Sequence, residues 1–360
     1  MEWSTQEIAM SKPKIDKLEE PKRATTFQLQ WLLEQINAKT RPIMEDQIRQ
    51  FCLRPSGPIL PATCRRAERL PDEYECVEDL TVGPDGEPCY VARKNDHVAV
   101  VHGEKVYEKI HHDQPDGCGG WRKHLLGFHP NGQPVVSVAF MNSLDYAISS
   151  PEELDADRRT LVYVGNELLI EEKGMNAVTL LSDGSVLYAK RLKDNTFVVI
   201  RNRETLLAPR NRKYLAFAES PIGELATAFV EGDLYVVGSL HNNRTVRVTS
   251  SQVSDIFWHE NGWYFLQRND KRWEIRSHES ERLHGLQDDH GCSGQFRVLP
   301  DGRTCYTSWT RHHHACHVVD GQLQPGFTYI SPLFERDGEW LYYGIIDRHL
   351  YLMELSPKTA

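Results

Sequence analysis

The sequence has no long uninterrupted apolar run and no basic, apolar leader at its start. No stretch approaches the roughly 18 apolar residues that a membrane-spanning helix needs. The chain begins MEWSTQEIAM, without the basic start and apolar run of a signal peptide. We therefore expect a cytoplasmic protein that does not insert into a membrane.

Motifs for disulfide, metal and nucleotide chemistry are also missing. The eight cysteines include no C-x-x-C pair, and without an export signal we expect reduced thiols. The chain has no G-x-S-x-G nucleophile elbow, no H-E-x-x-H motif, no P-loop and no G-x-G-x-x-G turn. These absences argue against the common hydrolase, zinc-protease and nucleotide-binding classes, and we expect no cofactor.

Negative charge dominates most of the chain. The 360 residues have a net charge of −9; the first 70 hold 12 basic and 9 acidic side chains and are near +3, so the remainder is near −12. Nucleic acid and anionic membranes attract basic surfaces, so an acidic body is a poor ligand for either. We expect the partner to be another protein.

A short turn recurs seven times. The intervals between its successive glycines are 46, 52, 39, 39, 40 and 36 residues. Asn-Gly and Asp-Gly between apolar runs favour hairpins, because glycine adopts positive φ without steric cost. The seven turns are Pro84–Gly86, Pro130–Gly132, Ser182–Gly184, Pro221–Gly223, Glu260–Gly262, Pro300–Gly302 and Arg336–Gly338. A period near 40 with short strands around each turn predicts propeller blades.

A second regularity lies four residues after each turn glycine. That position holds Tyr90, Tyr188, Tyr306 and Tyr342 in four units, and Val, Thr or Leu in the others. A β-favouring residue at a fixed offset predicts a buried position on the second strand of each blade. In the first unit, further strands are expected at His97–Val101 and Val106–Ile110, which gives four strands per unit.

The Pro-Asp-Gly hairpins followed by a tyrosine-bearing strand resemble the degenerate WD40-like repeats of TolB-type propellers. The resemblance covers roughly residues 74–355 and is one of fold, since the Trp-Asp dipeptide of true WD40 repeats is absent. It implies an all-β, seven-bladed β-propeller of four-stranded antiparallel blades, and no functional residue is carried over.

The last unit lacks a fourth strand, because the chain ends soon after Leu355. An open edge strand would be a template for aggregation. We expect the segment before the first unit, around Pro58–Cys64 or Arg65–Leu70, to supply the missing strand. The predicted propeller domain therefore spans residues 57–360 and is closed by an N-terminal strand.

Residues 25–56 form the predicted N-terminal α-helical extension, a helical hairpin. Leu29, Leu32, Leu33 and Ile36 lie on one helical face. The hairpin either packs on the propeller or, with Phe27 and Trp31, binds a partner. Residues 1–24 are polar and expected to be mobile.

Histidines and cysteines gather in loops of one propeller face. A local metal site from His290, Cys292, His312 and His314 is conceivable, since these are zinc-ligand types, but their spacing matches no known structural site. The alternative is exposed loops with a neutral histidine tract.

The same face is expected to carry basic residues that either contact an acidic partner or only solubilise the chain. They are Arg93, Lys94, Lys190, Arg191, Lys193, Arg268, Lys271 and Arg272.

Three functions remain open at this point. The first is a non-enzymatic protein-protein interaction module or scaffold. The second is a metal-dependent enzyme, a hydrolase or lyase, that uses the His-rich loops. The third is a structural subunit of a larger assembly, docked through the N-terminal helices. The absence of catalytic motifs favours the first.

Overall fold

The computed structural model describes residues 62–74, 76–94, 97–108, 120–141, 159–240, 245–248, 252–259, 262–269, 272–277, 282–285, 291–309 and 315–355. All of them belong to one unit of the chain, Ile48–Ala360, and their regular structure is β-strand. The predicted mobile N-terminus (1–24) and helical hairpin (25–56) lie outside the described residues, as do residues 57–61.

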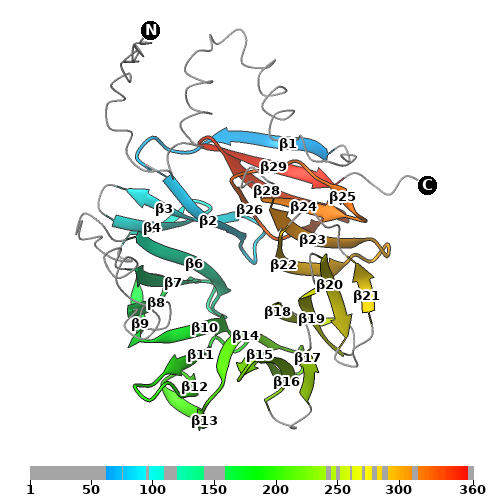
Figure 1. The fold of residues 1–360 in the computed structure, drawn as a ribbon. Coiled ribbons are helices and arrows are strands. Elements are labelled where there is room, and N and C mark those ends of the chain that lie inside the picture. The colour runs from blue at the N-terminus through cyan, green and yellow to red at the C-terminus, as the bar shows by residue number, and fades with distance from the viewer. Residues whose placement is uncertain are drawn as a thin grey trace, which may run out of the picture. The chain divides into compact units, whose positions relative to one another are not determined.

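Seven antiparallel sheets follow one another around the unit (Figure 1), which is a seven-bladed all-β propeller. The first strands of neighbouring sheets contact each other, so each blade runs outward in chain order. Blade 1 comprises β2 (Cys76–Val82), β3 (Pro88–Lys94), β4 (His97–His102) and β5 (Lys105–Tyr107). Blade 2 comprises β6 (Gly120–Phe128), β7 (Pro134–Met141), β8 (Arg159–Val164) and β9 (Glu167–Lys173). Blade 3 comprises β10 (Met175–Leu180), β11 (Val186–Arg191), β12 (Phe197–Arg201) and β13 (Glu204–Arg210).

The remaining blades repeat this plan. Blade 4 comprises β14 (Lys213–Glu219), β15 (Leu225–Glu231), β16 (Leu234–Ser239) and β17 (Thr245–Val248). Blade 5 comprises β18 (Gln252–His259), β19 (Gly262–Asn269), β20 (Arg272–Ser277) and β21 (Arg282–Gly285). Blade 6 comprises β22 (Gly291–Val298), β23 (Thr304–Trp309), β24 (Ala315–Val319) and β25 (Gln322–Leu323). Blade 7 comprises β26 (Tyr329–Ile330), β27 (Phe334–Arg336), β28 (Glu339–Ile346), β29 (His349–Leu355) and β1 (Ala62–Arg69).

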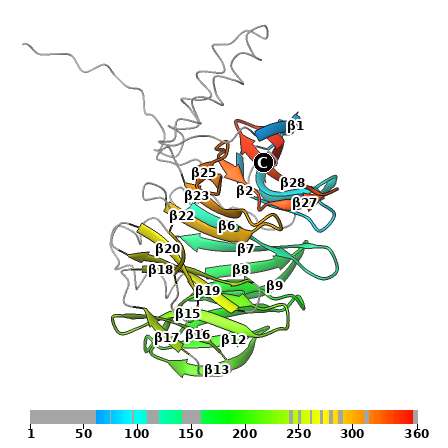
Figure 2. The ribbon, with the colours of Figure 1, turned by 90° about the vertical axis from the view of Figure 1, so that its right-hand side faces the viewer.

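Blade 7 takes its outermost strand from the other end of the described chain. β1 pairs antiparallel with β29, from Ala62 opposite Leu355 to Arg69 opposite His349. Figure 1 and Figure 2 both show β1 (blue) beside the C-terminal strands (red). The edge of β29 is thereby paired, and β1 becomes the outer edge of the blade.

Six of the seven predicted turn glycines have positive φ, while residues 260 and 261 of the turn before Gly262 lie outside the described residues. In blade 3, Gly184 has a φ of 85°, and the Asp183 carboxylate accepts a hydrogen bond of 2.9 Å from the Ser185 amide. Asp85, Asn131 and Asp301 make the equivalent bond to the residue two positions on. The Asn or Asp closes the turn, and the glycine supplies the left-handed backbone.

The position four residues after each turn glycine is buried in all seven blades, as predicted. Tyr188 and Tyr342 are fully buried, and Thr227, the most polar member, is 2% exposed. The other members are Tyr90, Val136, Leu266 and Tyr306. Apolar clusters between neighbouring blades, such as Leu187, Val199 and Phe229 between blades 3 and 4, hold the sheets together.

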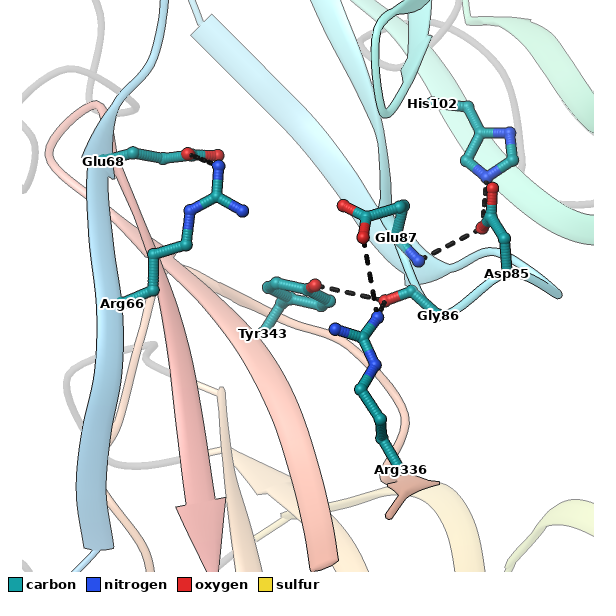
Figure 3. A network of polar contacts seen from close by, with 8 residues as sticks. All are labelled: Arg66, Glu68, Asp85, Gly86, Glu87, His102, Arg336 and Tyr343. Atoms are coloured by element: carbon teal, nitrogen blue, oxygen red, sulfur yellow. Dashed lines mark hydrogen bonds and ion pairs between the residues drawn. The ribbon is translucent and has the colours of Figure 1, made fainter.

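Hydrogen bonds to one backbone carbonyl join blade 7 to blade 1 (Figure 3). The oxygen of Gly86 accepts from the Arg336 guanidinium at 2.6 Å and from the Tyr343 hydroxyl at 3.1 Å. Arg336 also lies 3.6 Å from the Glu87 carboxylate. The neighbouring Asp85 is bound by buried His102 at 2.9 Å, which lowers the Asp85 pKa. These contacts fix the β2–β3 turn where the ring closes.

Candidate protein-binding surface

The propeller has two faces that differ in which strand ends they carry. Loops between first and second strands, and between third and fourth strands, lie on one face, which we call the turn face. Loops between second and third strands and between successive blades lie on the other, which we call the strand-end face. This follows from the antiparallel order within each blade.

Blade 3 gathers basic side chains on the strand-end face. We call this set the basic rim of blade 3, and it comprises Lys173, Lys190, Arg191, Lys193, Arg210, Arg212 and Lys213. They come from the ends of β9, β11 and β13, from the β11–β12 turn and from the start of β14.

Strand register explains why residues distant in sequence meet here. Phe197 of β12 pairs with Arg191 on β11 and with Arg210 on β13, so both arginines lie in one cross-strand row. The Arg191 amide donates to the Gly174 carbonyl at 2.9 Å, which places Lys173 beside that row. The Arg212 amide donates to the Arg210 carbonyl at 2.9 Å, so the chain turns tightly into β14.

Two residues of the basic rim already have polar partners in blades 2 and 3. The Lys190 ammonium lies 2.5 Å from the Glu172 carboxylate, with both side chains less than one-third exposed. Arg191 donates to the Asn195 side-chain oxygen at 2.9 Å. These contacts hold two of the residues predicted from sequence, Lys190 and Arg191, in fixed positions.

Arg212 is also held in place. Its guanidinium donates to Glu231 at 2.9 Å and lies 4.6 Å from the centre of the Phe229 ring. The guanidinium therefore makes a cation–π contact with the ring and a hydrogen-bonded ion pair with the carboxylate. Arg212 thus forms a fixed border of the rim toward blade 4.

Three members of the rim have no ion-pair partner in the part of the chain that the structure describes. They are Lys173, Lys193 and Arg210, and all three are exposed. Lys193 lies in a closed turn, in which the Leu192 amide donates to the Thr196 carbonyl at 2.8 Å. The Asp194 carboxylate in the same turn accepts from the Thr196 hydroxyl and amide, which lowers its pKa. The rim therefore presents available positive charge on a well-defined backbone.

The basic pair predicted on blade 1, Arg93 and Lys94, lies at the end of β3. The Lys94 ammonium lies 2.9 Å from Glu108 and 3.0 Å from Glu73, and these carboxylates raise its pKa. Lys94 is therefore engaged within blade 1, unlike Lys193 and Arg210 of blade 3.

Other predicted partner residues cannot be placed with their side chains. Arg268 lies on β19 and Arg272 on β20, and the structure describes only the backbone of these two residues. Lys271, Phe27 and Trp31 lie outside the described residues. Their role stays a prediction.

The predicted metal ligands fall largely outside the described part. His290, His312 and His314 are not described, and Cys292 lies on β22 with its backbone alone described. Among the residues that the structure does describe, no group of three or more His, Cys, Asp or Glu side chains could hold a metal ion.

His317, which follows the loop histidines His312 and His314 in the sequence, is buried between blades 6 and 7. Its Nε2 lies 2.9 Å from the Ser331 carbonyl, and its Nδ1 lies 3.8 Å from the Cys305 thiol. Burial lowers the pKa of His317 to about 4 and raises that of Cys305. Both groups are neutral at pH 7, so this pair lacks the thiolate that a cysteine nucleophile needs.

Among the described residues, Cys64, Cys89, Cys305 and Cys316 form no disulfide. Cys89 and Cys316 are buried, and burial raises the pKa of both thiols, that of Cys316 to about 12. Within the described residues, moreover, no helix has the length and apolarity that crossing a bilayer requires.

No protein-family model matches the chain, and no curated protein matches its sequence. Solved structures resemble it in fold. "YCF48 bound to D1 peptide" aligns with a TM-score of 0.49 at 13% identity, over 85% of this chain and 99% of that one. The WD40 propeller domain of Doa1 aligns with a TM-score of 0.44 at 12% identity, over 83% and 98%. Virginiamycin B lyase from Staphylococcus aureus aligns with a TM-score of 0.45 at 9% identity, over 81% and 99%.

These neighbours range from a peptide complex to a lyase, so they assign no function to this chain. The seven-bladed fold that the WD40-like resemblance implies is confirmed by the strand pairing described above, independently of these alignments.

Four members of the basic rim were not among the basic residues predicted from the sequence, and a local sequence signal was available for three of them. Arg210, Arg212 and Lys213 form a basic run within four residues, at the boundary between two repeat units. Lys173 stands alone among acidic neighbours, and its place beside Arg191 follows from strand register, which the sequence does not state.

Proposed function

We propose that the chain is a non-enzymatic protein-binding module and that the basic rim of blade 3 contacts the partner. The observation that supports this most is the set of exposed cations without ion-pair partners among the described residues: Lys173, Lys193 and Arg210. Such cations give up no existing pair when they bind a carboxylate. Lys94 of blade 1 would first have to leave Glu73 and Glu108.

Rigidity of the surroundings supports the same function. The row of Arg191, Phe197 and Arg210 belongs to three paired strands, and Phe197 is 6% exposed. A surface that is already ordered loses little conformational entropy on binding. Rigid scaffolds with exposed loops are common platforms for recognition.

The buried pair of Cys305 and His317 argues against nucleophilic catalysis by this cysteine. Both groups are neutral, and His317 is 1% exposed. The predicted metal-dependent activity would use His290, Cys292, His312 and His314, and docking through the N-terminal helices would use residues 25–56. Both alternatives stay predictions, because none of these side chains is described.

A comparison of three tagged baits tests the proposal in extracts of the native host. The baits are the unchanged chain, the rim variant K193E/R210E, and the control K105E/R247E, which makes the same charge change at exposed residues of blades 1 and 4. We expect a protein that the unchanged chain and the control retain, and that the rim variant retains at least fivefold less by quantitative mass spectrometry. If the rim variant and the control retain the same proteins in equal amounts, the rim is not the contact surface.

A further inference from the structure

The cations of the basic rim are spaced apart along the strand ends and the β11–β12 turn. Arg191 and Arg210 lie on strands either side of β12, and neighbouring strands are about 4.8 Å apart, so their backbones are about 10 Å apart. Lys193 lies at the turn beyond this row, between β11 and β12. Same-side residues of an extended peptide repeat about every 7 Å. Long acidic side chains on such a peptide can therefore reach successive cations of the rim.

Carboxylates lie beside several of the rim's cations. Glu172 pairs with Lys190, Glu231 pairs with Arg212, and Asp194 lies next to Lys193 in the turn. A continuous phosphate backbone passing over the rim would meet these three negative groups. A peptide with separated carboxylates can place one at each available cation and avoid them.

The turn face carries many exposed carboxylates. They are Asp85, Glu104, Glu167, Asp183, Glu204, Glu224, Asp301, Asp320 and Asp337, with Lys105 and Arg203 as exposed cations nearby. An acidic ligand is repelled from that face and attracted to the strand-end face of blade 3. This charge distribution orients an approaching acidic ligand and increases the rate at which it binds.

We infer that the basic rim of blade 3 binds an extended, carboxylate-rich segment of a partner protein. The inference rests on the proposed protein-binding function and adds the chemistry of the segment. Lys193 and Arg210 make the ion pairs with the segment, while Lys190 and Arg212, held by their own carboxylates, border it.

Binding of a fluorescent peptide of alternating glutamate and serine to the full chain tests this inference, with anisotropy as the readout. We expect the rim variant K193E/R210E to weaken binding at least tenfold, and the control K105E/R247E to leave it within twofold. Raising the salt concentration should weaken binding by the unchanged chain, because exposed ion pairs are screened. Circular dichroism of each variant checks that the blades are folded.

Two results would overturn the inference. One is a peptide that does not bind the unchanged chain, or that binds the rim variant equally well. The other is a single-stranded oligonucleotide of equal charge that binds the rim as tightly as the peptide does, which would identify nucleic acid as the better ligand. If the peptide fails while the rim variant still loses its partner in the bait comparison, the partner's chemistry is wrong and the protein-binding function stands. If the bait comparison fails, the function itself is wrong.

Discussion

His317 is a buried polar residue that the fold keeps neutral and hydrogen-bonded. Its ring packs edge-on against Tyr342, with 4.9 Å between ring centroids, and its Nε2–H donates to the Ser331 carbonyl. Burial in the interior disfavours the imidazolium, and the positive charge of Arg297 adds to this effect. The folded chain therefore holds His317 neutral to about pH 4, whereas the unfolded chain protonates it near pH 6.5.

This difference predicts an acid-dependent loss of stability. Between pH 6.5 and 4 the unfolded state binds more protons, so the contribution of His317 is complete above pH 6.5 and is lost as the pH falls toward 4. From pH 7 to pH 4.5 the unchanged chain should lose about 2 to 3 kcal/mol more unfolding free energy than His317→Gln, whose amide does not titrate. Urea denaturation at a series of pH values measures this, and parallel curves for the two proteins would contradict it.

At the scale of elements, the hairpin turns show which parts of the fold the sequence determines. Asn-Gly and Asp-Gly turns and the buried position four residues later follow from local backbone preference and from the repeat, and both predictions are confirmed. The ends of strands are predicted less accurately than the turns. A strand was expected at Val106–Ile110, whereas β5 spans Lys105–Tyr107. An end depends on the partner strand, which local sequence does not specify.

The closing strand β1 was expected from the incomplete last unit, but side-chain contacts between distant elements had no signal in the sequence. The bond from Arg336 to the Gly86 carbonyl joins residues 250 positions apart. The same limit applies to the basic rim, where Lys190, Arg191 and the run from Arg210 to Lys213 are visible in the sequence but their adjacency is not. Register across β11, β12 and β13 brings them together.

The β2–β3 turn provides a controlled test of the contact between blades 7 and 1. Gly86 and Gly223 have φ values of 77° and 81°, so alanine is strained at both. A Cβ on Gly86 would lie 2.5 Å from the Arg336 guanidinium, whereas one on Gly223 would meet nothing within 4 Å. We expect Gly86→Ala to lower the unfolding free energy by about 1 to 2 kcal/mol more than Gly223→Ala, because the Arg336 hydrogen bond is also lost. Equal losses in chemical denaturation would show that this contact contributes little.

At the scale of the whole molecule, the propeller combines a rigid ring with an uneven distribution of charge. Apolar clusters between blades and the pairing of β1 with β29 hold the ring together. Exposed carboxylates dominate the turn face, while available cations gather on the strand-end face of blade 3. We propose that this rim is where a partner protein binds.

Photo-crosslinking from defined positions tests that claim most directly. A benzophenone amino acid replaces Lys193 in one version of the full chain and Lys105 of the turn face in another, and both are irradiated in cells of the native host. The account predicts a discrete crosslinked protein from position 193 that position 105 does not give, and that disappears when Arg210→Glu is added. Equal crosslinking from both positions, or crosslinking from position 105 alone, would contradict it.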